Sequence, residues 1–141
     1  MLLAIDPGVS TGWALFNGTV LTACGLGHPR HRALDVTQVI IEHPRIYPGG
    51  RTRDPNAIVK LAVNAGEWGG RYAHVGPVSY VEPRVWMRGN PPKGINHNRI
   101  RAELRADERD VLAAVLRALP ESKHEHVLDA AGIGLFHLGR R

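Results

Sequence analysis

The stretch Met1-Leu-Leu-Ala-Ile-Asp-Pro-Gly-Val-Ser-Thr-Gly-Trp-Ala-Leu-Phe16 decides the fold. A short apolar run ends on Asp6, a Pro-Gly turn follows, and a second apolar run begins at Gly12. Two such runs around a turn are typical of a β-hairpin, so we expect strands over Leu2–Asp6 and Gly12–Asn17. Asp6 then stands at the mouth of the first strand, where a carboxylate can reach a metal ion or a phosphate.

The rest of the chain predicts strands followed by helices. Further strands are expected over Thr19–Cys24, over Val36–Glu42 and over Pro77–Val81. Helices are expected after the cap Asp54-Pro55, after a cap at Asn96 through Leu104, after a cap at Asp107 up to a stop at Pro120, and from about His124 to Leu138. Two arginine-containing segments, 44–53 and 84–94, are expected to be exposed loops. This order predicts an α/β fold with a five-stranded mixed sheet flanked by helices.

Length and composition restrict the class of protein. The 141 residues fit a single domain spanning 1–141. Cys24 is the one cysteine, which excludes an internal disulfide and favours a reducing, intracellular setting. No run approaches the ~20 apolar residues of a membrane span, so no membrane partner is expected. The net charge of +5 favours a polyanionic partner such as nucleic acid.

Acidic residues at element ends indicate the chemistry. Glu42 closes an apolar run as Asp6 does, and His126 and Asp129 lie at i and i+3, on one face of the expected last helix. Each taken singly has an ordinary explanation: a turn residue, a solvated strand end, a capping pair. Together, carboxylates and an imidazole at one sheet edge suit divalent cations that activate water against a phosphodiester. Glu82 is a further candidate, whereas Glu67 is expected to be a solvated helix residue.

The ordered motifs resemble a known family. Ile5-Asp6-Pro7-Gly8, Val39-Ile40-Ile41-Glu42 and His126-Val127-Leu128-Asp129-Ala130-Ala131-Gly132-Ile133 are similar, in order and context, to those of the RuvC group of Holliday-junction resolvases. That group lies within the RNase H-like (retroviral integrase-like) superfamily. The resemblance covers most of the chain, and the compact length is similar to that of a phage-type member of the group.

The resemblance carries specific implications. It implies an RNase H-like fold and a crossover junction endodeoxyribonuclease that uses two Mg²⁺ ions, with Mn²⁺ able to substitute. It implies Asp6, Glu42, His126 and Asp129 as catalytic metal ligands. The expected partners are a four-way DNA junction and a second copy of the chain, since a twofold dimer meets two equivalent strands. The expected location is the cytoplasm of a bacterial or phage-infected cell.

The sequence departs from the family pattern in two places. Only residues 25–35 fill the interval where the family has a long helix before the glutamate strand. Arg45 stands where the family often has an aromatic wedge, and Tyr47 is the nearest aromatic, able either to stack on a base or to pack. A basic residue that aids catalysis is expected at Lys93 or Arg99. The candidate phosphate contacts in the two basic loops are Arg51, Arg53, Arg84, Arg88 and Lys93.

Three alternatives stay open. The first is an RNase H-like nuclease for RNA or for flapped or other branched DNA. The second is an ATP-binding phosphotransferase-like domain, because Asp6-Pro-Gly-Val-Ser-Thr-Gly12 also resembles the first phosphate loop of the actin and sugar-kinase group. That group normally needs a second lobe and a second phosphate loop, which are not visible here. The third is a basic binding module without catalysis.

Overall fold

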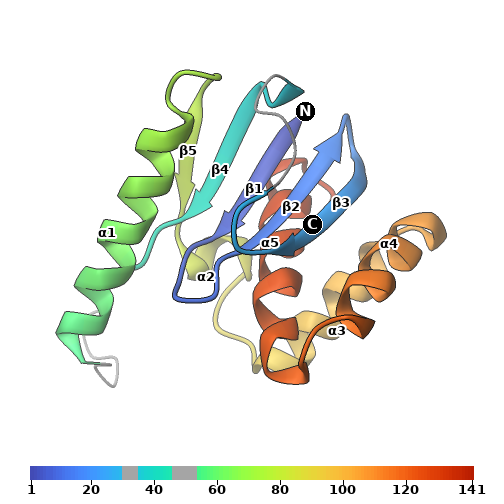
Figure 1. Ribbon diagram of the computed structural model, residues 1–141. Helices are drawn as coiled ribbons and strands as arrows, with labels where there is room; N and C mark the ends of the chain where they lie inside the picture. The colour runs from blue at the N-terminus through green and yellow to red at the C-terminus, as the bar shows by residue number, and fades with distance from the viewer. Residues whose placement is uncertain (30–34, 46–53) are drawn as a thin grey trace.

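The computed structural model describes residues 1–29, 35–45 and 54–141 (Figure 1). A five-stranded sheet has the order β3-β2-β1-β4-β5. Its strands are β1 (Leu2–Asp6), β2 (Gly12–Asn17), β3 (Val20–Leu26), β4 (Gln38–Glu42) and β5 (Val78–Val81). β1 pairs antiparallel with β2 and parallel with β4, while β2 pairs antiparallel with β3 and β4 parallel with β5. The sheet is therefore mixed, as the sequence predicts.

Helices cover both faces of this sheet. They are α1 (Pro55–Tyr72), the short α2 (Pro83–Trp86), α3 (Lys93–Glu103), α4 (Ala106–Arg117) and α5 (His124–His137), with a 3-10 turn, η2, at Glu121–Lys123. Figure 1 shows α1 on one side of the sheet and α3, α4 and α5 on the other. No helix in the described ranges has the length and apolar character needed to cross a membrane.

Strand alternation builds two separate cores. Leu3 and Ile5 of β1 pack with Trp68 and Tyr72 of α1. Leu2 and Ala4 point to the opposite face and pack in the core that contains most of α5. Because successive strand residues face opposite sides, Asp6 lies on the α5 face together with Leu2 and Ala4.

Helix α5 is buried along most of its length because it lies directly on the sheet. Val127, Ala130, Ala131 and Ile133 have no exposed surface. A side chain at Gly12 would collide with the backbone carbonyl of His126, so β2 and the start of α5 approach each other at a glycine. This contact fixes the height of His126 and Asp129 relative to the end of β1.

Several predicted boundaries are wrong. The expected loop 84–94 contains the end of α2, and α3 begins at Lys93 rather than at Asn96, which is buried inside the helix. Arg105, not Asp107, caps α4, because the side chain of Glu108 bonds back to the Arg105 amide at 2.7 Å. The predicted start of α1 is confirmed: Asp54 Oδ1 accepts from the Asn56 amide at 3.0 Å.

Candidate active site

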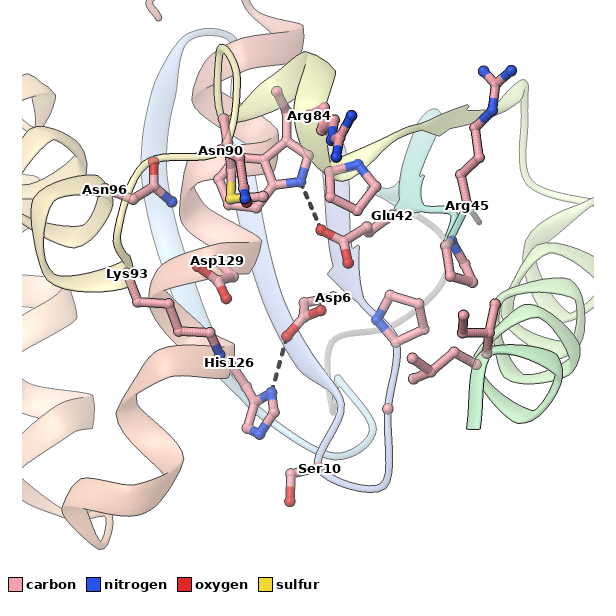
Figure 2. Close-up of a pocket in the computed structure, with 18 of the residues that line it drawn as sticks. Asp6, Ser10, Glu42, Arg45, Arg84, Asn90, Lys93, Asn96, His126 and Asp129 are labelled. Carbon is pink, nitrogen blue, oxygen red and sulfur yellow. Dashed lines mark hydrogen bonds and ion pairs between the residues drawn. The ribbon is translucent and has the colours of Figure 1, made fainter. Parts of the chain in front are cut away.

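A cavity of about 820 Å³ opens at the carboxyl ends of β1 and β4. Asp6, Glu42, His126 and Asp129 all line it, together with residues of the β1–β2 turn and of α1, α2 and α3. Figure 2 shows the carboxylates of Asp6, Glu42 and Asp129 directed toward one shared space. Asp6 and Asp129, which are 123 positions apart in the sequence, are thus brought to one site.

The parallel pairing of β1 and β4 places the first two acids. Ile5 is the register partner of Ile41, and Asp6 and Glu42 each follow one residue later. The side-chain alternation then turns both carboxylates to the α5 face. His126 and Asp129 come from α5, where a spacing of three residues keeps them on one side of the helix.

Asp6 and His126 are directly bonded. His126 Nδ1 lies 3.0 Å from Asp6 Oδ2, so the imidazole donates to the carboxylate. Burial raises the pKa of Asp6 to about 6, the hydrogen bond from His126 opposes this, and the charge of Asp129 adds to it. The same hydrogen bond raises the pKa of His126 above its ordinary value. The hydrogen bond therefore favours the ionised form of Asp6 and the protonated form of His126.

Glu42 is held by an indole. Trp86 Nε1 donates a 2.6 Å hydrogen bond to Glu42 Oε2 (Figure 2), and Trp86 itself is 1% exposed. Burial and then repulsion from Asp6 raise the pKa of Glu42 to about 8. Without a counter-charge this carboxyl is largely protonated near neutral pH.

Asp129 has an imidazole partner from α3. His97 Nε2 lies 3.0 Å from Asp129 Oδ1, and both side chains are largely buried. Each of the three carboxylates thus has one oxygen engaged by a side chain of another element. The second oxygen of each carboxylate is available to a ligand bound in the cavity.

The donor set suits a divalent cation in chemistry, although the described ranges contain no group of three or more His, Cys, Asp or Glu side chains already arranged to hold one. Carboxylate oxygens are the ligands that Mg²⁺ and Mn²⁺ prefer, and the imidazole adds one nitrogen donor to the set. The raised pKa values of Asp6 and Glu42 are what buried carboxyls have when no cation balances their charge. A divalent cation would favour the ionised form of both.

Basic side chains line the same cavity. Arg45, Arg84, Lys93 and Lys123 contribute to its wall. Lys93 Nζ lies 2.6 Å from Glu125 Oε2, Lys123 Nζ donates to Ser10 Oγ at 2.6 Å, and Arg45 pairs with Glu82 at 2.5 Å. The rim of an acidic site is therefore cationic, which suits an anionic polymer.

The remaining expected residues are placed differently. Arg88 and Arg99 are exposed and stand outside the cavity wall, as does Glu82. Of the two catalytic candidates, Lys93 lies in the wall and Arg99 does not. Glu67 is exposed, as expected. Tyr47, Arg51 and Arg53 fall outside the described residues.

Sequence reasoning missed the partners of the carboxylates. Trp86 and His97 carry no local signal for this role, because their partners lie 44 and 32 residues away. The sequence predicts Asn96 as a helix cap, whereas Asn96 lines the cavity and accepts a hydrogen bond from Arg141. Trp86, Asn96 and His97 lie near Pro83, Pro91 and Pro92, and these prolines obscure the local helix signal.

The fold and site define a class: an RNase H-like mixed sheet with an acidic cavity at the ends of its two central parallel strands. The chain has the fold of RuvC. A structure described as "T. thermophilus RuvC in complex with Holliday junction substrate" matches with a TM-score of 0.53 and 20% identity, covering 96% of this chain and 91% of that chain. A second structure, "Thermus thermophilus RuvC structure", matches at 18% identity and a TM-score of 0.39, covering 96% and 92%. No family model and no curated protein matches the sequence.

Proposed function

We propose that this protein is a metal-dependent DNA endonuclease that resolves four-way junctions. The observation that carries the proposal is the convergence of Asp6, Glu42, His126 and Asp129 on one cavity in a chain with the RuvC fold. Burying several acids side by side costs roughly 1–4 kcal/mol per close pair, depending on the effective dielectric. Such a cluster is therefore more readily explained by a cation-dependent reaction than by folding.

Asp6, Glu42, His126 and Asp129 would hold the metal ions. Bound there, divalent cations supply an activated water and stabilise the leaving oxygen of a phosphodiester. The protein's own contribution is to hold the carboxylate oxygens in place: Trp86 donates a hydrogen bond to Glu42, and the Nδ1–H of His126 donates one to Asp6. His126 must be neutral to act as a ligand, which couples activity to pH.

The cationic rim supports a DNA substrate. Arg45 and Lys93 stand at the cavity, and both are more than half exposed although each is paired with a glutamate. A phosphate can replace these partners, because exposed ion pairs contribute only about 0–1 kcal/mol each. The matched RuvC structure is described as a complex with a Holliday junction, which supports a branched substrate for this fold.

A homodimer follows from the symmetry of the substrate. A four-way junction has two equivalent strands to cut, and one cavity per chain can reach one of them. Two copies related by a twofold axis would introduce paired nicks. A supercoiled plasmid with an extruded cruciform distinguishes this case, since coordinated cuts give linear product whereas a single active site gives nicked circles.

The test is a panel of labelled substrates incubated with Mg²⁺, Mn²⁺ or a chelator. We expect symmetric, metal-dependent cleavage of the four-way junction and little cleavage of duplex, single strand, flap or RNA–DNA hybrid. Preferential cleavage of a flap or a hybrid would instead support the broader nuclease assignment. No metal-dependent cleavage of any nucleic acid by the folded protein would overturn the proposal.

A further inference from the structure

Helices α3 and α5 meet through two successive contacts on matching faces. His97 contacts Asp129, and Ile100 packs at Gly132. The two contact residues on each helix are three positions apart. His97 and Ile100 therefore share a face of α3, and Asp129 and Gly132 share a face of α5. The His97–Asp129 hydrogen bond is therefore one contact within a defined helix interface.

Gly132 sets the closeness of this interface. A Cβ at position 132 would lie 2.7 Å from Ile100 Cδ1 and 2.8 Å from Trp86 Cζ3. Ile100 has no exposed surface and Trp86 is 1% exposed, so neither has open space into which to move. The glycine thus allows α3 to approach α5 far enough for the His97 imidazole to reach the carboxylate one turn away.

His97 stands behind Asp129 and outside the cavity. Its side chain is 12% exposed and that of Asp129 is 17% exposed. Asp129 and the neighbouring Asn96 line the cavity, whereas His97 does not. An ionised carboxylate can only accept, so Nε2 carries the proton and donates to Oδ1. This bond opposes rotation of the carboxylate and leaves Oδ2 for a ligand in the cavity.

We infer that His97 is a positioning residue: its Nε2–H holds Asp129 Oδ1 at 3.0 Å, so that the carboxylate presents its other oxygen to the cation bound in the cavity. This inference rests on the proposed function, because it assigns His97 a purpose through the same cation. Partners of metal-binding side chains commonly change metal affinity or activity by about 10–100-fold when removed. Trp86 stands in the same relation to Glu42, from the same α2–α3 segment.

A matched pair of substitutions separates positioning from packing. His97→Gln keeps an N–H donor at about the reach of Nε2, whereas His97→Met has similar length and no donor. Gln and Met are similar in length and are both good helix formers, so the two variants differ chiefly in the hydrogen bond. Asn98→Ala, at the exposed neighbouring position of α3, is the control for general effects on the helix.

The readouts are Mn²⁺ affinity of the DNA-free protein, followed by electron paramagnetic resonance of free Mn²⁺, and kcat and KM on a labelled four-way junction. We expect His97→Met to lose about 10–100-fold in Mn²⁺ affinity and in kcat at subsaturating metal, with KM for DNA within about twofold. His97→Gln should stay within about threefold of the unsubstituted protein, and Asn98→Ala should be unchanged. Thermal unfolding of each variant establishes that it is folded.

Equal behaviour of the Gln and Met variants, whether both active or both impaired, would overturn the positioning role. A KM change without a change in Mn²⁺ affinity or kcat would overturn it as well. Failure of the proposed function looks different: the unsubstituted protein itself would then bind no Mn²⁺ and cut no DNA.

Discussion

The indole of Trp86 donates a 2.6 Å hydrogen bond to Glu42 Oε2 in the wall of the acidic cavity. This contact joins α2 to the end of β4 and lowers the pKa of a carboxyl that burial raises to about 8. A tryptophan N–H can only donate, so it favours the ionised, metal-binding form of Glu42. Trp86 therefore influences the protonation of Glu42 as well as the position of its carboxylate.

Trp86→Phe tests this relation. Loss of the donor should raise the pKa of Glu42 further, so the acid limb of the pH–rate profile should move to higher pH and kcat should fall by about 10-fold or more. The control is Trp68→Phe, the same change at a buried tryptophan on the other face of the sheet. An acid limb that stays in place in Trp86→Phe, measured on the four-way junction, would contradict the assignment.

Asp6→Asn should abolish cleavage while leaving junction binding intact. The amide keeps the shape of the side chain and removes the anionic oxygen that a cation needs, so we expect a loss of at least about 10³-fold in kcat. The measurements are cleavage rate and gel-shift affinity on the same junction. Asp110→Asn, at an exposed position of α4, gives a charge-matched control that should retain full activity. Normal cleavage by Asp6→Asn would remove the metal-site proposal.

Glu42→Gln should stabilise the metal-free protein at alkaline pH. The pKa of Glu42 rises from its ordinary 4.5 to about 8 on folding, so this carboxyl stabilises the fold fully below about 4.5 and loses that contribution as the pH rises through about 8. A neutral amide avoids the buried charge. We expect a gain of about 1–3 kcal/mol in urea unfolding at a pH above about 8, and little change near pH ~5. Mg²⁺ should stabilise the unsubstituted protein and so reduce the difference in unfolding free energy between it and Glu42→Gln. A gain in unfolding free energy at acidic pH alone would contradict this reasoning.

Gly12→Ala should damage both the fold and the site. The added methyl group meets the backbone carbonyl of His126, which has no rotamer through which to move away. Overpacking of this kind costs about 1–3 kcal/mol, and the shift of α5 should lower Mn²⁺ affinity. Gly66→Ala in α1 is the contrasting control, because a Cβ there meets open space and alanine favours the helix. Chemical denaturation of both variants, together with Mn²⁺ titration, makes the comparison.

Glu108→Gln should destabilise the protein at neutral pH and much less in acid. Glu108 has no exposed side-chain surface and accepts from both arms of Arg140, at 2.6 and 2.8 Å, and from the amides of Leu21 and Arg105. Burial alone would raise the pKa of Glu108, but these hydrogen bonds hold it at about 2. The ionised Glu108 therefore stabilises the fold fully above about pH 4.5, and this contribution is lost as the pH falls toward about 2. We expect a loss of about 3 kcal/mol at neutral pH, measured by urea unfolding; an equal loss near pH ~2 would contradict it.

Much of the sheet could be predicted because its signals are local. The bounds of β1 and β2 are confirmed, since an apolar run, a Pro-Gly turn and a second apolar run specify a hairpin within 17 residues. The predicted ends of the next two strands differ from the structure: β3 extends to Leu26 and β4 begins at Gln38, because the ends of a strand depend on pairing with other strands. The prolines of segment 84–94 predict a loop, whereas the structure has most of α2 and the start of α3 there.

Sequence alone determined that Asp6 and Glu42 end strands and that His126 and Asp129 share a helical face, because periodicity and turn chemistry act over a few residues. Only the tertiary structure decided that these groups meet at one cavity, with Trp86 and His97 as their hydrogen-bond partners. Parallel pairing of β1 with β4 and the close approach of α5 at Gly12 produce that meeting. Such contacts join residues far apart in the chain, and their burial raises the pKa of the two strand-end acids, which no local pattern encodes.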